Sequence, residues 1–345
     1  MKDFLICSAH DVTEDGKLDN LIIDLKNLSP KIILWWTGFE YELPSNINID
    51  EFYKLESIVK EIDAVLYFIF GSVENEKHKE IYPTEKFKYL YWPTFLLSQT
   101  YQVIKNNGGK SKLEEYHIEK DFKNLFISYN HNPHLHRCML MDKLYGNDLF
   151  KYGRLSWNKL STDYYINYEF QHWKEDYMKV DEYVKNGFRV EISDTLLEPK
   201  SLFNLISETD NEYLIFSEKT WRTILIEHPF LCLGAQYQNL KLKEYGFKLY
   251  DEIFDYSFDE KPNLEDRVDG IIKNIVSLKD RDYDELYSLI EEKVKFNKNR
   301  ALEIIENDSF VPEKFVNLFK QNKYEFNFKV NNVVPHYMDY ILKNK

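Results

Sequence analysis

The chain has few cysteines and no long apolar run. Only three of its 345 residues are cysteines, and Cys7, Cys138 and Cys232 lie far apart in apolar segments. We expect reduced, buried thiols rather than disulfides or a zinc site. No apolar run approaches the roughly 20 residues that a membrane helix needs, and the first residues turn polar too soon for a signal peptide. The sequence therefore predicts a cytoplasmic protein without a membrane span.

Several motifs that mark familiar kinds of catalytic site are also missing. The sequence contains no GxxxxGK(S/T) phosphate loop, no GxGxxG turn, no GxSxG nucleophile elbow and no HExxH zinc pair. It also has no convincing Asp-x-Asp motif of the kind with which metal-dependent transferases hold a cation. We therefore expect neither a resident cofactor nor a metal site.

The composition is that of a globular protein with a large core. Hydrophobic residues make up 43% of the chain, aromatic residues 16% and charged residues 30%, with a net charge of −13. The length is sufficient for two domains. The negative charge argues against a large nucleic-acid footprint, which needs a basic face. Charge can segregate, however, and residues 311–345 carry six lysines against three acids.

Short apolar runs divide the chain into two α/β segments. In the first, residues 4–7, 32–36, 65–70 and 89–92 are predicted strands, and 50–62 has apolar residues at helical spacing. In the second, we predict strands at 125–129, 203–206, 229–233 and 247–250, a helix from 136 to 144, and two helices across 264–306. The stretch at 107–111, with two adjacent glycines, is typical of a linker between them.

The most informative segment begins at the apolar run 203–206. This predicted strand ends at Ser207 and Glu208, and Ser217 then stands where a helix N-cap is expected, before another strand at 229–233. Open α/β sheets bind ligands where strands end and helices begin. The order of these residues therefore predicts a binding site.

Glu218, Lys219 and Arg222 fall in the first turns of that predicted helix. A carboxylate can bind ribose hydroxyls, and Lys or Arg can neutralise a diphosphate leaving group. The residues therefore suit a nucleotide-sugar ligand. The structural alternative is a capped helix in which Glu218 pairs with Arg222 four residues later.

A second cluster follows the predicted strand at 125–129. The strand runs into a polar loop that begins at Asn130, and Arg137 lies in the helix that follows. Backbone N–H groups at such a helix start, together with an arginine, can hold a phosphate. A polar loop closed by a capped helix is the alternative.

The same loop holds His131, His134 and His136, which raises the possibility of a metal site. These histidines lack the i,i+4 spacing of a helical metal pair, and no nearby cysteine or acid completes a ligand set. We therefore do not expect them to bind metal.

A third cluster follows the predicted strand at 32–36. Aromatic residues, among them Trp36 and Phe39, stand beside Glu40 and Glu42. A carboxylate opposite the donor can deprotonate an acceptor hydroxyl, and aromatic rings can stack on a sugar or a base. Glu40 and Glu42 are thus candidate general bases, with an ordinary surface loop as the alternative.

The second and first clusters together resemble the donor domain of fucosyltransferase-like glycosyltransferases of the GT-B type, of the kind seen in phage and bacterial proteins. The shared pattern is a strand, an Asn-containing loop and a helix with Arg137, then Glu208, the run 217–221 and the proline-led strand at 229–234. The resemblance covers roughly residues 125–275.

That resemblance implies roles for individual residues. Arg137 and Lys219 would contact the donor diphosphate, Glu218 would contact the ribose, and Glu208 would lie beside the donor. The N-terminal part of the chain carries no such resemblance, so neither the donor sugar nor the acceptor follows from it.

The predicted fold class is α/β and GT-B-like, with two Rossmann-like domains facing across a cleft. Residues 1–118 would form an acceptor-binding domain and residues 119–310 a nucleotide-sugar domain. Residues 311–345 would form a tail that packs back on the N-terminal domain.

The predicted function is metal-independent, inverting transfer of a sugar from a nucleotide sugar to a hydroxyl. Glu40 or Glu42 would be the catalytic base. The predicted donor-binding residues are Asn130, Arg137, Glu208, Ser217, Glu218, Lys219 and Arg222. The nucleotide sugar is a co-substrate, and the sequence does not identify its nucleotide.

The acceptor stays open between two classes. One is a hydroxymethylated base in phage DNA, which would place the protein in the host cytoplasm; the other is a glycan. Two further functions also stay open: a non-catalytic protein that binds a nucleotide sugar or glycan, and a metal-dependent hydrolase that uses His131, His134 and His136.

Overall fold

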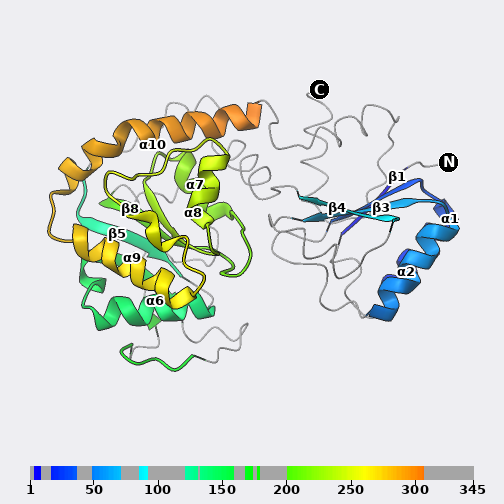
Figure 1. Ribbon diagram of the computed structural model, residues 1–345, viewed down its shortest axis with the longest axis horizontal. Helices are drawn as coiled ribbons and strands as arrows, with labels where there is room; N and C mark the ends of the chain where they lie inside the picture. Colours follow the sequence, from blue (N-terminus) through cyan, green and yellow to red (C-terminus); the bar gives the residue numbers. More distant parts are fainter. Residues whose placement is uncertain are drawn as a thin grey trace. The chain divides into compact units, whose positions relative to one another are not determined.

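The computed structural model (Figure 1) describes residues 4–8, 17–36, 49–70, 85–91, 121–130, 133–158, 168–173, 177–178 and 200–306. Two compact units divide the chain, so that the described residues up to 91 belong to unit 1 and those from 121 belong to unit 2. The predicted linker at 107–111 and the predicted tail at 311–345 lie outside the described residues, and the predicted domain boundaries stay predictions.

Unit 1 is a parallel sheet with helices packed on it. Its strands β1 (Phe4–Ser8), β2 (Ile32–Trp36), β3 (Val65–Phe70) and β4 (Phe87–Tyr91) lie side by side in chain order. Helix α1 (Lys17–Leu28) joins β1 to β2, and α2 (Ile49–Glu61) joins β2 to β3. Because right-handed crossovers that step in one direction put their helices on one face, α1 and α2 lie together and touch (Figure 1).

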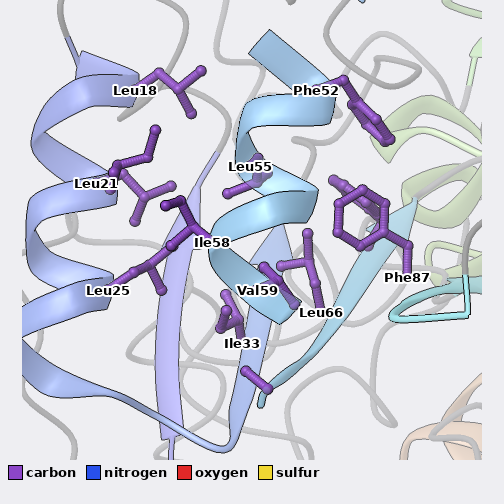
Figure 2. Packing of buried hydrophobic residues seen from close by; sticks show 13 residues of the cluster. Leu18, Leu21, Leu25, Ile33, Phe52, Leu55, Ile58, Val59, Leu66 and Phe87 are labelled. Atoms are coloured by element: carbon purple, nitrogen blue, oxygen red, sulfur yellow. The ribbon is translucent and has the colours of Figure 1, made fainter. Parts of the chain in front are cut away.

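The core of unit 1 lies between these two helices and the sheet. Figure 2 shows leucine and isoleucine side chains of α1 and α2 meeting Ile33 and Leu66 of the strands. Phe52 of α2 stacks on Phe68, with ring centroids 5.7 Å apart, and Phe87 meets both rings edge-on at 4.9 and 5.4 Å. The aromatic trio fixes α2 on the sheet, since such ring geometries are favourable beyond their buried area.

Unit 2 is built on a mainly parallel sheet in the order β7-β6-β5-β8-β9. Strands β5 (Asn124–Tyr129), β6 (Gly153–Asn158), β8 (Ser201–Ser207) and β9 (Phe230–Leu233) are parallel, while β7 (Tyr177–Met178) runs antiparallel to the end of β6. Every residue of β8 is buried, as expected for a parallel strand covered on both faces.

The helices of unit 2 cover both faces of its sheet. Helix α6 (Leu135–Gly146) leads from β5 to β6, whereas α7 (Glu218–Leu225) leads from β8 to β9 in the opposite direction. Right-handed crossovers in opposite directions put their helices on opposite faces. Accordingly, α6 contacts α9 (Leu264–Leu278) and α7 contacts α10 (Tyr283–Glu306) (Figure 1). The point between β5 and β8, where the direction reverses, is the topological switch point of this sheet.

Three shorter elements complete the described part of unit 2. They are helix α8 (Gln238–Glu244) and the 3-10 turns η2 (Phe150–Tyr152) and η4 (Tyr256–Phe258). Both units are therefore mixed α/β structures with parallel sheets. No helix within the described ranges is both long and apolar enough to cross a bilayer.

The strands predicted at 4–7, 32–36, 65–70, 125–129, 203–206 and 229–233 are confirmed, as are the helices at 50–62, from 136 and across 264–306. The strand predicted at 89–92 corresponds to β4, which begins two residues earlier, at Phe87. The strand predicted at 247–250 is wrong. The side-chain amide of Asn297 on α10 instead bonds the backbone of Lys248, accepting from its N–H and donating to its carbonyl, at 2.8 Å each. These backbone groups are satisfied by a side chain rather than by a neighbouring strand.

Adjacent positions on α2 test the aromatic trio. Phe52 is 3% exposed and Tyr53 57% exposed. We expect Phe52→Ala to lower the unfolding free energy of unit 1 by about 3–5 kcal/mol, because it leaves a cavity beneath the helix. Tyr53→Ala should change it by no more than about 0.5 kcal/mol. Urea unfolding of both variants checks this, and equal losses would contradict the described packing.

Candidate functional site

The candidate site lies at the switch point of unit 2, where β5 and β8 end. These neighbouring strands pair directly. The chain leaves β5 through Asn130 and leaves β8 through Glu208. Ligands of open α/β sheets bind outside the carboxyl ends of the strands at this point. The topology thus brings together Asn130 and Glu208, two residues of the predicted donor-binding set that are 78 positions apart in the sequence.

Glu208 ties the end of β8 to the start of α7. Its side chain is fully buried. Oε1 accepts hydrogen bonds from the Ser217 N–H, at 3.1 Å, and from the Thr220 hydroxyl. Oε2 accepts from the Thr209 N–H at 3.2 Å. A carboxylate near a helix N-terminus is also favoured by the helix dipole, so Glu208 holds the first turn of α7 against the strand.

The first turn of α7 presents a capped N-terminus and a lysine. Ser217 is the N-cap predicted from the sequence, since its Oγ accepts from the Lys219 N–H at 3.3 Å. The Lys219 ammonium donates to Ser217 Oγ at 3.3 Å and to Thr209 Oγ1 at 3.4 Å. Glu218 is the first residue of the helix, and its side chain lies outside the described part of the structure. The positive end of the α7 dipole and the Lys219 ammonium therefore lie in the same place.

Arg222 lies one turn further along α7. Its guanidinium carbon is 5.7 Å from the ring centroid of Tyr129, the last residue of β5. This is the range of a cation–π contact. Arg222 therefore joins α7 to β5, the other strand of the switch point.

Asn130 fixes the end of β5 to both neighbouring strands. Its N–H donates to the carbonyl and the hydroxyl of Ser156 on β6, at 3.2 and 3.1 Å. Its side-chain amide donates to Ser128 Oγ at 2.9 Å, and that hydroxyl donates to the Leu205 carbonyl of β8 at 2.7 Å. Among the described residues, no group hydrogen-bonds the buried Oδ1 of Asn130.

The first turn of α6 reaches the backbone of Glu208. Arg137 is buried, and its Nη2 donates to the Glu208 carbonyl at 3.0 Å. His136 is fully buried, and its Nε2 lies 2.8 Å from the same oxygen. Its other ring nitrogen, Nδ1, lies 3.2 Å from the side-chain amide of Asn211. Two side chains of α6 therefore hold one carbonyl at the end of β8.

His134 and His136 lie beside Arg137, and both have a lowered pKa. Burial, and then the neighbouring charges of Arg137 and Lys219, lower the pKa of His134 to about 4, against the opposing effect of Asp210. Burial and Arg137 likewise hold the pKa of His136 well below its ordinary value. Burial is the larger cause of both shifts, and Arg137 adds a positive charge beside both rings that would favour an anion here.

The structure brings most of the predicted donor-binding residues to one place. Hydrogen bonds link Arg137 to Glu208 and Glu208 to Ser217, and Lys219 follows directly. Asn130 is hydrogen-bonded at the end of β5, and Arg222 lies over the ring of Tyr129, the last residue of that strand. The predicted bases Glu40 and Glu42, and also His131, lie outside the described residues.

The described residues show no group of three or more His, Cys, Asp or Glu side chains that could hold a metal ion. Both ring nitrogens of His136 lie within hydrogen-bond distance of protein groups. In this conformation neither is available to a metal.

Sequence reasoning missed several residues that shape the loop between β8 and α7. Gln238 of α8 donates to the Ile215 carbonyl at 2.7 Å, and Arg267 of α9 donates to the Asn211 carbonyl at 3.0 Å. Thr220 bonds the Glu208 carboxylate. These residues carry no motif, because side chains that satisfy a distant carbonyl have no fixed spacing from it. Thr220 lies in the run 217–221 that the sequence singles out, but its bond to Glu208 was not predicted.

No protein-family model matches the chain, and no curated protein matches it. A solved structure described as "Crystal Structure of alpha1,3-Fucosyltransferase" is similar over 85% of this chain and 91% of its own, at 10% sequence identity and a TM-score of 0.36. At this TM-score the likeness carries no argument about what the chain does.

Replacing the Glu208 carboxylate by an amide tests whether it anchors the first turn of α7. Glu208→Gln puts an NH₂ group where backbone N–H groups now donate, so we expect the unfolding free energy to fall by about 1–3 kcal/mol. Glu212 is an exposed residue of the same loop, and Glu212→Gln should have an effect within about 0.5 kcal/mol. Urea unfolding measures both. If Glu208→Gln is as stable as the unchanged protein, Glu208 does not anchor α7.

We expect the buried His228 to make the protein less stable in mild acid. His228 is fully buried with Nε2 2.8 Å from the Ser201 carbonyl, and burial lowers its pKa from 6.5 to about 4. Between these two values the unfolded chain binds a proton that the folded chain does not. Stability should therefore fall as pH drops through this window, by about 1.4 kcal/mol per pH unit for such a group.

Urea unfolding between pH 7 and pH 4.5 checks the effect. His228→Phe should make this part of the pH dependence shallower, because it removes the titrating group from both states. A slope equal to that of the unchanged protein would show that His228 does not titrate as its burial requires.

Proposed function

We propose that the chain is a glycosyltransferase that binds a nucleotide sugar at the carboxyl ends of β5 and β8. The observation that carries the proposal is the position of Lys219, in the first turn of α7 at the switch point. A helix N-terminus with a lysine is suited to a diphosphate, because the helix dipole and the ammonium both attract negative charge.

The chemistry assigned to this site is stabilisation of a leaving group. When the bond between the anomeric carbon and the diphosphate breaks, negative charge develops on the diphosphate oxygens. The Lys219 ammonium would stabilise that charge, and the nearby Arg137 would add to the positive field. Glu218, as the first residue of α7, is proposed to contact the ribose. The transfer is proposed to be metal-independent.

The proposed catalytic base is Glu40 or Glu42. Its carboxylate would take the proton of the acceptor hydroxyl while the hydroxyl oxygen forms a bond to the anomeric carbon. Attack from the side opposite the leaving diphosphate inverts the configuration at that carbon. Glu40→Gln and Glu42→Gln separate the two candidates, since loss of the base should abolish transfer and leave donor binding intact.

The wider architecture belongs to the same proposal. Two Rossmann-like domains would face across a cleft, with the acceptor held by the N-terminal domain and the tail at 311–345 returning to it. The proposed acceptor is a glycan or a hydroxymethylated base in DNA. Transfer assays with both acceptor classes and one labelled donor decide between them.

A thermal-shift screen tests donor binding. A ligand that binds only the folded protein raises its melting temperature, so we expect one of UDP, GDP, CMP or their sugars to raise it in the presence of a chelator. Lys219→Ala should remove the shift. Lys241→Ala is the matched control, because this lysine lies on α8 and pairs with Glu244, and it should keep the shift.

The outcomes separate the functions left open by the sequence. A shift without donor hydrolysis or transfer would indicate a non-catalytic binding protein. A shift lost on chelation would favour a metal-dependent activity. No shift with any of these nucleotides would leave the first turn of α7 as a capped structural helix and overturn the proposal.

A further inference from the structure

His136 is a fully buried histidine at the candidate site that the proposed chemistry does not use. It lies in the first turn of α6, and both ring nitrogens face protein groups at 2.8 and 3.2 Å. Burying an imidazole N–H is costly unless an acceptor takes it, and the Glu208 carbonyl is that acceptor. Glu208 and Asn211, the residues beside the two ring nitrogens, belong to the same loop after β8. The ring therefore sets the position of that loop.

Hydrogen bonds of Glu208 connect this loop to α7. The backbone oxygen of Glu208 is held by His136, while its carboxylate holds the Ser217 N–H and the Thr220 hydroxyl. Ser217 in turn holds the Lys219 ammonium through its Oγ, at 3.3 Å. Each step joins side chain to backbone or to another side chain. A displaced Glu208 would therefore displace the lysine as well.

The protonation state of His136 fits this role. Burial and the adjacent Arg137 lower its pKa, so the ring is neutral at pH 7. A neutral imidazole carries one N–H, and the carbonyl beside Nε2 accepts it. The Arg137 guanidinium donates to the same oxygen at 3.0 Å. The carbonyl is thus fixed from two directions.

We propose that His136 is a positioning residue for the donor site, which keeps the first turn of α7 and Lys219 in place by holding the Glu208 carbonyl. The inference rests on the proposed function, because it takes the diphosphate of a nucleotide sugar as the ligand that Lys219 binds. It concerns the geometry of the site and not a contact between His136 and the ligand.

The chain contains a matched control in His228. Both histidines are fully buried, and the Nε2 of each lies 2.8 Å from a backbone carbonyl. They differ in position, because His136 bonds the carboxyl end of β8 at Glu208, whereas His228 bonds its amino end at Ser201. Replacing either ring by phenylalanine removes the same kind of hydrogen bond at similar volume.

The experiment compares His136→Phe, His228→Phe and His136→Gln in the full chain. The dissociation constant is measured for the nucleotide sugar that stabilises the unchanged protein most. We expect His136→Phe to weaken binding about 10- to 100-fold, the range in which a misplaced group lowers activity. His228→Phe should lower the melting temperature and bind within about twofold of the unchanged protein. His136→Gln, which keeps an N–H, should recover part of the affinity.

Amide hydrogen exchange of the free protein supplies a second readout. His136→Phe should speed exchange at the Ser217 N–H, which donates to Glu208, and His228→Phe should not. Equal binding losses in both phenylalanine variants, or unchanged binding and exchange in His136→Phe, would overturn the inference. If the unchanged protein binds no nucleotide sugar, the proposed function fails, and exchange at Ser217 still decides whether His136 positions α7.

Discussion

The buried carboxylate of Glu208 is the constraint on which the rest of the candidate site depends. Removing a carboxylate from water is costly unless donors replace the water, and here three protein donors do so. The donors come from the loop after β8 and from the first turn of α7. The strand end and the helix start therefore behave as one body. Because that body lies at the switch point, the positive end of α7 is fixed where a ligand of this kind of sheet would bind.

The same arrangement concentrates positive charge in an acidic protein. The chain carries a net charge of −13, yet Arg137 and Lys219 both act on His134 at the start of α6. Side chains of α6, α8 and α9 hold the carbonyls of the loop between β8 and α7. A rigid loop loses little entropy when a ligand binds, which favours affinity. Positive charge therefore lies beside a loop, between β8 and α7, that side chains of three helices hold in place.

Local patterns predicted β1 to β5, β8, β9 and the N-cap at Ser217, because period and capping chemistry are local, but they missed β6 and β7. The helix α1 was not among the predicted elements, although Leu18, Leu21 and Leu25 have helical spacing. The strand predicted at 247–250 does not form, because the side chain of Asn297, 49 residues further along the chain, hydrogen-bonds the backbone of Lys248. The sequence also placed Glu208 at the site without showing that its carboxylate turns inward to α7. Such long-range partners have no local signature.

The central claim is that the switch point of unit 2 binds the nucleotide sugar. Hydrogen exchange with and without the stabilising nucleotide sugar tests it most directly. The account predicts slower exchange in the segments around Asn130 and from Glu208 to Arg222, and unchanged exchange at the amino ends of the strands near Ser201 and His228. Protection confined to other segments, with exchange from Glu208 to Arg222 unaffected, would contradict it.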